Sequence, residues 1–550
     1  REPADKARIE IEKWGKIDRH AVVFVTGLGD IAFLKQLVIK IVPSIQLVIY
    51  EPSLNVFFKV IENIDLSFLF EDRIPALIVD GLNGEEKKAI LEKLVTLANI
   101  EFIKHYENRS CAALFSAQVI DFMKLLGKTV EDVIVGRNTG IRYSAVEMDN
   151  LFHNIKYLCE GSITTQLCDI IPTDIPAIIV SAGPSLNKNI MELKGAKNKA
   201  FIVAVDTAVR PLVNAGIIPD MYVIVDGLKP KELLDFDEAK RIPLMPSITS
   251  TKEILENHTG KKIFWFEGQR FIWSMMMMNG VPFSTVACGG SVACSAFSLV
   301  YKLGFSRIIL VGQDLALTGN KTHADGTFKS IMDEIDTSRC IKVPGNYEEE
   351  VPTRGDFKLY LDWFNYYIKG CEGIHVINAT EGGAKIDNTE IMTLHDAIMR
   401  ECIKEVDIDA CFEKLKPIFN AEQQHKALEY LKTFPEMYRK LKKKVIKLNK
   451  EYQKLKTICG KSIIDKNAYL KALKNIKNLT QEIENHELYD TISCTLTVAN
   501  YIIESEQFYE EDTVAAEGLQ IAKQGIAYTK MVEQCIDLFM PLTEETLLTL

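Results

Sequence analysis

One stretch, residues 177–226, most constrains what this 550-residue chain can fold into. It holds three apolar runs, and a segment of helical pattern separates each run from the next. Strands that alternate with helices form a mainly parallel sheet, and such sheets bind ligands beyond the carboxyl ends of their strands. Each run is followed there by polar or small residues: the turn Ser181-Ala182-Gly183-Pro184-Ser185, then Asp206-Thr207, then Asp226. The stretch therefore predicts the floor of a nucleotide site.

A second small-residue turn, Gly289-Gly290-Ser291, precedes a helical pattern at 292–303. Small residues before a helix let backbone N–H groups approach a phosphate, and the helix dipole favours the anion. Ser291 suits either a helix N-cap or a phosphate ligand, since both roles use the same hydroxyl. The turn predicts a phosphate-binding element.

The residues after the strand 307–311 bear on the chemistry. Asp314 stands at the end of that strand, and a polar loop with Thr318 and His323 follows. His323 could act as a general base, or in its protonated form it could neutralise a leaving phosphate. The other interpretation is an exposed loop histidine without a catalytic role, and the residues leave both interpretations open. The polar turn after the strand 375–378 extends the predicted pocket with Asn378, Thr380 and Glu381.

The overall pattern predicts an α/β protein in three parts. A Rossmann-like α/β domain is expected at 1–150, a central α/β catalytic domain at 151–392 and a C-terminal α-helical bundle at 393–550. Within these, we expect a helical region at 113–150 that breaks between Gly136 and Gly140. We expect C-terminal helices at 421–456 (bent at Pro435), 467–486, 491–506 and 513–539.

The N-terminal domain has its own glycine turn, Thr26–Asp30, and Glu51 ends the next strand. A glycine turn followed by an acid is typical of cofactor folds, but a lone G-x-G also serves as a structural turn. We favour the structural interpretation.

Composition narrows the function classes. The net charge of −10 argues against a general nucleic-acid binder, and no apolar stretch is long enough to span a membrane. Scattered cysteines and no visible signal peptide predict a cytoplasmic protein with reduced thiols. The basic segment 439–456 is either a solvated helix face or a docking surface for an acidic partner or membrane headgroups. Asp235-Phe236-Asp237 has a metal-binding D-x-D pattern, although surface acids explain it better.

Several motifs in order resemble one family, the motility-associated factor (Maf) flagellin glycosyltransferases of bacteria. They are the turn 181–186, Asp206-Thr207, GIIPD at 216–220, GGSV at 289–292, GQDL at 312–315, HADG at 323–326 and NATEGG at 378–383. The central domain is also similar to bacterial CMP-dependent sialyltransferases. It departs from them at Ala182, where they carry Asn, and after Asp314, where they carry tyrosines; phosphate contacts then fall to His323, Thr318 or Lys321.

The resemblance implies a protein O-glycosyltransferase that moves a pseudaminic- or legionaminic-type nonulosonic acid from CMP to Ser or Thr of flagellin. It implies no obligatory cofactor, with Mg²⁺ as an option, and a helical domain that recognises flagellin. The expected catalytic residues are Asp314, His323 and Asp226. The expected donor-binding residues are Ser181, Gly183, Pro184, Ser185, Asp206, Thr207, Gly289, Gly290, Ser291, Thr318, Asn378, Thr380 and Glu381.

Two other functions stay open. Archaeal 6-hydroxymethylpterin diphosphokinases share the central domain and would need ATP and Mg²⁺, although the long flanking domains argue against that activity. A non-catalytic flagellin chaperone is the third hypothesis. The sequence does not fix the sugar, the modified sites or the oligomeric state.

Overall fold

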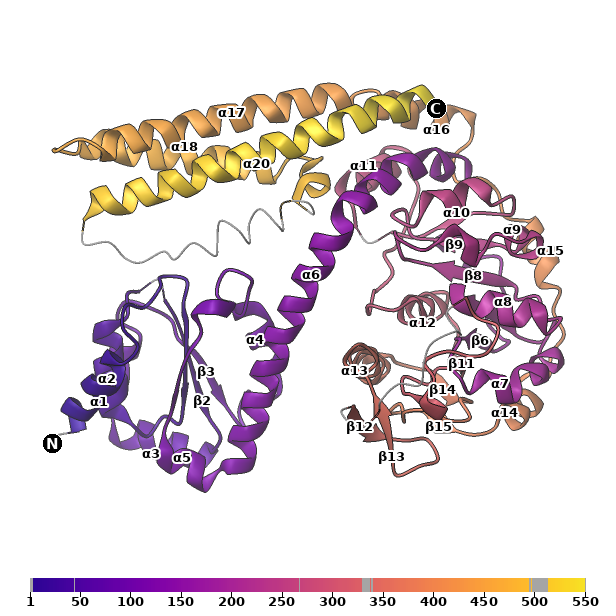
Figure 1. Ribbon diagram of the computed structural model, residues 1–550, viewed down its shortest axis with the longest axis horizontal. Coiled ribbons are helices and arrows are strands. Elements are labelled where there is room, and N and C mark those ends of the chain that lie inside the picture. Colours follow the sequence, from indigo (N-terminus) through magenta and orange to yellow (C-terminus); the bar gives the residue numbers. More distant parts are fainter. Residues whose placement is uncertain are drawn as a thin grey trace. The chain divides into compact units, whose positions relative to one another are not determined.

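The computed structural model describes residues 3–549 apart from 44, 267, 329–336, 338–339, 494–495 and 497–512. The chain forms two compact units, one of residues 1–144 with 438–538 and one of residues 145–437 with 539–550 (Figure 1). The borders of the three predicted domains stay a prediction.

The first unit contains a parallel four-stranded sheet in the order β3-β2-β1-β4. Its strands are β1 (Val22–Thr26), β2 (Gln46–Glu51), β3 (Ala76–Val79) and β4 (Lys104–Glu107). Its helices are α1 (Pro3–Glu12), α2 (Ile31–Lys40), α3 (Leu54–Asn63), α4 (Lys87–Leu94) and α5 (Arg109–Leu114). Every residue of β1 is buried, because a central parallel strand is covered on both faces. The predicted Rossmann-like domain is confirmed.

Helix α6 (Ser116–Glu160) runs without interruption for 45 residues. The predicted break between Gly136 and Gly140 is therefore wrong. A single glycine inside a helix costs only about 1 kcal/mol relative to alanine. Two isolated glycines therefore need not break a helix of this length.

The C-terminal helices differ from the prediction at one point. The expected single helix at 421–456 is two helices, α16 (Ala421–Leu431) and α17 (Phe434–Cys459). Pro435 lacks an N–H and its ring clashes with the carbonyl four residues earlier, so the proline starts a helix instead of bending one. The others expected are present as α18 (Lys466–Glu484) and α20 (Val514–Thr549), while most of 491–506 lies outside the described residues.

The second unit is built on a parallel seven-stranded sheet in the order β15-β14-β11-β6-β7-β8-β9. The strands are β6 (Ala177–Val180), β7 (Phe201–Val205), β8 (Met221–Ile224), β9 (Leu244–Pro246), β11 (Arg307–Val311), β14 (His375–Asn378) and β15 (Glu390–Ile391). The described residues of this unit also form two short pairs of strands, β5 (Ser162–Ile163) with β10 (Ile263–Phe264) and β12 (Ile341–Pro344) with β13 (Glu350–Thr353).

Helices cover both faces of this sheet. Figure 1 shows α12 (Val292–Lys302) and α13 (Gly355–Gly370) on one face, and α7 (Leu186–Asn189), α8 (Asp206–Asn214) and α14 (Leu394–Glu401) on the other. This unit also contains α16 and the helices α9 (Asp237–Arg241), α10 (Lys252–Asn257), α11 (Arg270–Met278) and α15 (Ile408–Glu413). The predicted α/β class with a helical C-terminal part is confirmed.

The order of the strands fixes where a ligand would bind. The chain lays down β6, β7, β8 and β9 in one direction and then returns to place β11 on the other side of β6. The strand order thus reverses between β6 and β11, and open α/β sheets bind ligands at such a switch point. Among the described helices, none is both long and apolar enough to cross a membrane.

Candidate functional site

Two loops meet at the switch point: residues 181–185 after β6 and residues 312–317 after β11, here called the switch-point loops. The Ser181 N–H donates to the carbonyl of Val311 at 2.8 Å, and the Gly183 N–H donates to the carbonyl of Gly312 at 2.8 Å. The hydroxyl of Ser181 also donates to the side-chain oxygen of Gln313. These bonds continue the sheet pairing beyond the strands and hold both loops in one shape.

The contact leaves no room for a side chain at Gly183. A β-carbon there would lie 2.1 Å from Oδ1 of Asp314 and 2.5 Å from the carbonyl oxygen of Gly312. Gly312 itself has φ +65°, and a β-carbon on it would lie 2.2 Å from the Ser181 carbonyl oxygen. Glycine is therefore required at both positions because the two loops approach each other too closely for a β-carbon. At Gly312 the positive φ also favours glycine.

Asp314 belongs to the second of these loops, and its side chain is only 2% exposed. Its carboxylate accepts from the Ser185 hydroxyl at 2.6 Å and from the Ser185 N–H at 3.1 Å. Burial raises the pKa of Asp314, and hydrogen bonds from Ser185 oppose that rise. The carboxylate therefore fixes the start of α7 and does not face open solvent.

The turn after β14 joins the same network. Thr380 accepts the Gln313 N–H on its hydroxyl at 3.0 Å, and its own N–H donates to the Asn378 side chain at 3.1 Å. Glu381 accepts from the amide of Asn189 at 3.0 Å. Asn378 and Thr380 were predicted to line the pocket, but both are fully buried. Their side chains therefore support the loop of residues 312–317 through these hydrogen bonds.

The loop that carries His323 lies against the residue 181–185 loop. The Ala324 N–H donates to the Ala182 carbonyl at 2.8 Å, and the Asp325 N–H donates to the Asn187 side chain at 3.0 Å. His323 directly precedes these two tethers and is half-buried, and its Nδ1 lies 3.0 Å from the Thr322 hydroxyl. Thr318 is also half-buried, so the structure brings both residues to the edge where the sequence placed them.

The turn Gly289–Ser291 opens α12, which runs back toward the start of β11, so its N-terminus lies at the carboxyl edge of the sheet. Ser291 caps the helix by accepting the Cys294 N–H at 3.3 Å. A β-carbon on Gly289 would lie 2.5 Å from the Trp363 ring, and one on Gly290 (φ +81°) would lie 3.1 Å from the Tyr360 ring.

Tyr360 and Trp363 were missed in the sequence because no motif contains them. They lie three residues apart in α13, so they share one face of that helix. The sequence signal that could have found them is the aromatic density of FKLYLDWFNYY at 357–367, which follows a polar loop at the same sheet edge.

The two remaining predicted acids lie along the same edge. Asp206 begins α8, is 2% exposed and pairs with the Lys229 ammonium at 3.0 Å, beside a half-buried Thr207. Asp226 is half-exposed and accepts the Leu228 N–H at 2.8 Å. Asp226 follows β8, three strands from β11, so about 14 Å of sheet separates it from the strand that carries Asp314. The sheet order does not bring these two carboxylates together.

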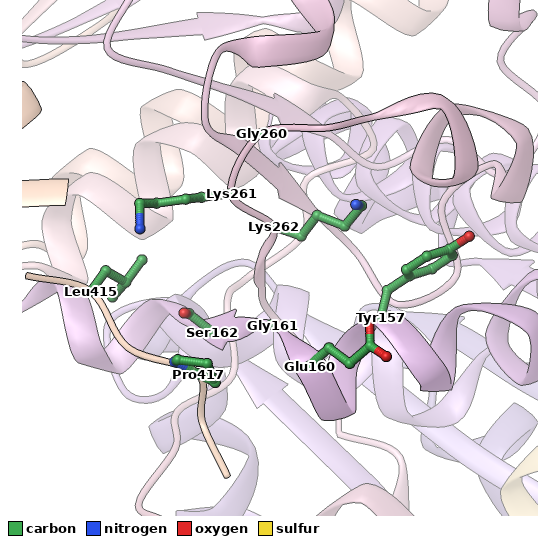
Figure 2. A pocket seen from close by; sticks show the side chains of 9 residues that line it. All are labelled: Tyr157, Glu160, Gly161, Ser162, Gly260, Lys261, Lys262, Leu415 and Pro417. Atoms are coloured by element: carbon green, nitrogen blue, oxygen red, sulfur yellow. The ribbon is translucent and has the colours of Figure 1, made fainter. Parts of the chain in front are cut away.

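A separate pocket of about 220 Å³ lies elsewhere in this unit and is lined by Tyr157, Glu160, Gly161, Ser162, Gly260, Lys261, Lys262, Leu415 and Pro417 (Figure 2). Lys262 pairs with Leu244, the first residue of β9, which puts this pocket at the amino edge of the sheet. Figure 2 shows Lys261 and Lys262 pointing in opposite directions, and the Lys262 ammonium donates to the His258 carbonyl. The pocket is therefore at the edge opposite the switch-point loops.

Two further sequence motifs, the D-x-D pattern and the N-terminal glycine turn, have structural roles away from the carboxyl edge of the central sheet. Asp235 of the D-x-D pattern is exposed and pairs with Lys240 at 2.5 Å. In the first unit, Glu51 is buried and its carboxylate accepts the N–H groups of Leu28 and Ser53, which favours the structural interpretation of that turn. Within the described ranges, His, Cys, Asp and Glu form no group of three or more that could hold a metal ion.

Comparisons with known proteins agree with this architecture. A family model described as "6-hydroxymethylpterin diphosphokinase MptE-like" matches residues 149–320. A protein of Treponema pallidum (strain Nichols), described as uncharacterized, is 24% identical over 144 residues, 26% of this chain and 67% of that protein.

A solved structure described as a Maf glycosyltransferase from Magnetospirillum magneticum AMB-1 matches with a TM-score of 0.60. The match covers 99% of this chain and 84% of that chain at 16% sequence identity. The resemblance to Maf proteins that the motifs predicted is thus confirmed at the level of the fold.

Proposed function

We propose that this chain is a glycosyltransferase that moves a nonulosonic acid from its CMP-activated form to serine or threonine hydroxyls of flagellin. The observation that carries the proposal is the convergence of the switch-point loops, the His323 loop and the Gly289–Ser291 turn at one sheet edge. A fold like that of a Maf glycosyltransferase over 99% of the chain supports it. The cytoplasmic location and the flagellin-binding role of the C-terminal helices belong to the same proposal.

The donor phosphate would lie at the N-terminus of α12. Its backbone N–H groups and dipole favour an anion, and the exposed Gly290 places no side chain over the backbone, while the Trp363 ring packs on Gly289. Ser291 and Thr318 supply hydroxyl donors at the same edge. A nucleoside monophosphate has no diphosphate to chelate a cation, so we propose transfer without an obligatory metal, with Mg²⁺ as an option.

The transfer breaks the bond between the anomeric carbon and a phosphate oxygen, and the electron pair leaves with CMP. The acceptor oxygen bonds to the same carbon, and its proton passes to a base. Positive charge on the sugar in between gives an oxocarbenium-like transition state, as in glycoside hydrolysis. Half-buried His323 and half-exposed Asp226 are the groups we assign to proton transfer and charge stabilisation.

Asp314 takes a positioning role in this proposal in place of direct catalysis. Its carboxylate is 2% exposed and already accepts two hydrogen bonds from Ser185. A carboxylate engaged in this way shapes the loop that meets the nucleotide. Its loss would act through the geometry of residues 181–185.

A second candidate is ATP-dependent diphosphorylation of 6-hydroxymethylpterin, which the family model at residues 149–320 favours. The matched range includes the switch-point loops and the Gly289–Ser291 turn but ends before His323. The similarity to a glycosyltransferase extends over the whole chain, so we rank glycosyl transfer first.

Calorimetry separates the two enzymes. We expect CMP to bind in the absence of divalent cations, and ATP with Mg²⁺ to bind at least about tenfold more weakly, a difference of 1.4 kcal/mol. The double variant Ser185→Ala, Asp314→Ala should lose CMP binding. Tighter binding of ATP with Mg²⁺ would support the diphosphokinase, and unchanged flagellin glycan mass in cells carrying the double variant would favour a chaperone.

A further inference from the structure

Helices α17 and α18 form an antiparallel hairpin, and both bury one side. Buried residues follow three- and four-residue spacings: Tyr438, Leu441, Val445, Leu448 and Leu455 in α17, and Ala472, Ile476, Leu479 and Ile483 in α18. The Asn475 amide donates to the Glu451 carboxylate at 3.1 Å, and Lys444 pairs with Glu482 at 3.1 Å, which joins the two helices. Figure 1 shows α20 beside them.

The opposite side of the hairpin is basic. Six exposed lysines, here called the lysine face, are Lys440, Lys443, Lys447 and Lys450 in α17 and Lys471 and Lys474 in α18. The four in α17 repeat the spacing of the buried stripe, so they line one side of the helix. Lys442 pairs with Asp537 of α20 at 2.8 Å and marks the α20 side, while Lys444 marks the α18 side. The stripe between them faces away from both helices.

The acids beside this face are already engaged. Glu451 pairs with Lys454 at 2.5 Å, and Glu482 pairs with Lys444. Like charges at three- and four-residue spacings destabilise a helix, so the stripe is not explained by helix stability. It is also local, because the whole chain carries a net charge of −10.

Apolar side chains are exposed among the same lysines. Ile446 lies three residues after Lys443 and four before Lys450 and is 37% exposed; Leu470, four before Lys474, is 53% exposed. Ile463, in the turn of the hairpin, is 83% exposed. Exposed aliphatic groups between cations are typical of helices that lie on a lipid surface.

We propose that the lysine face docks this protein on an anionic lipid bilayer. Lysine ammonium groups act as hydrated point charges, which suit a diffuse anionic surface, whereas the planar fork of arginine suits defined carboxylate and phosphate partners. Arg439 is the one arginine in residues 434–484. Ile446, Leu470 and Ile463 would enter the interface between the headgroups. This proposal does not rest on the proposed glycosyl transfer.

Co-sedimentation of the full chain with lipid vesicles tests the proposal. We expect binding to phosphatidylcholine vesicles that contain about one third phosphatidylglycerol, no binding to phosphatidylcholine alone, and loss of binding when salt rises from about 0.1 M to about 0.5 M. The face variant replaces five lysines by glutamine and should bind at least about tenfold more weakly: Lys443, Lys447, Lys450, Lys471 and Lys474.

A matched control makes the same charge change on exposed lysines of the other unit, and it should bind as the wild type does: Lys194, Lys369, Lys385, Lys414 and Lys416. Ile463→Ser keeps every charge and should weaken vesicle binding at low salt. Equal loss in the control, equal binding to neutral vesicles, or no vesicle binding at all would overturn the proposal. Binding to polyglutamate in preference to anionic vesicles would overturn it in favour of an acidic polypeptide partner.

Discussion

Replacing Gly183 by alanine would put a methyl group where two atoms already stand. The new β-carbon would lie 2.1 Å from Oδ1 of Asp314 and 2.5 Å from the carbonyl oxygen of Gly312. Both atoms are fixed, since Asp314 is held by Ser185 and Gly312 accepts the N–H of residue 183. The loop must therefore move by about 1 Å, which in a well-packed region costs about 1–3 kcal/mol.

The same movement should reach function. A displacement of about 1 Å at a group that positions substrate can lower a rate about 100-fold. We expect Gly183→Ala to lower the melting temperature by a few degrees, to weaken CMP binding at least about tenfold and to lower sugar transfer about 100-fold.

Gly370→Ala is the control, because no heavy atom lies within 4 Å of a β-carbon at that position in the same unit. It should leave CMP binding unchanged and stability unchanged or slightly higher. If Gly183→Ala bound CMP as tightly as Gly370→Ala, the switch-point loops would not be the nucleotide site.

Four further changes test the site and its support. Ser185→Ala removes a buried hydrogen bond of 2.6 Å to Asp314 and should cost about 1.5–3 kcal/mol in denaturant unfolding; a cost near zero would show that the bond is not formed. Because the pKa of Asp314 is raised in the fold, the folded state binds more protons than the unfolded state above about pH 4, and wild-type stability falls there as pH rises. Asp314→Asn lacks this titration, so its stability relative to the wild type should increase with pH. A stability difference that is constant with pH would contradict this. Burial lowers the pKa of His258 to about 3, so wild-type stability should fall by up to about 1.4 kcal/mol per pH unit as pH drops from 6.5 toward 3. His258→Gln should flatten that slope, and equal slopes would mean that the histidine is protonated in the fold. Glu51→Gln should destabilise the first unit and leave CMP binding intact, and loss of CMP binding would assign the N-terminal turn to the nucleotide site.

The strands of the central sheet could be predicted closely, because buried parallel strands are unbroken β-branched runs. β6 and β11 begin and end at the predicted residues, and Asp206 and Asp314 follow their strands as expected. The short edge strands β9 and β15 could not be predicted, because runs of three and two residues are too short to show a strand pattern. The predicted helix ends were wrong where they depended on one residue type. The two glycines did not break α6, and Pro435 stands at the start of α17 instead of bending one long helix.

The residues of the candidate site could be predicted from the ends of the strands, but the role of each residue could not. Asp314 and Asp226 both follow a strand in the sequence, yet Asp314 is 2% exposed within a switch-point loop and Asp226 is half-exposed after a strand three positions away in the sheet. Tertiary packing decides that difference. It likewise decides that Tyr360 and Trp363, far along the chain, pack on the Gly289–Ser291 turn.

The intact mass of flagellin tests the central claim most directly. Purified flagellin incubated with this protein and a CMP-activated nonulosonic acid should gain mass in steps of one sugar residue, with one CMP released for each step. The Gly183→Ala protein should give little gain over the same time. No gain in mass with the wild-type protein and an authentic donor and acceptor, or consumption of ATP with a hydroxymethylpterin in its place, would contradict the account.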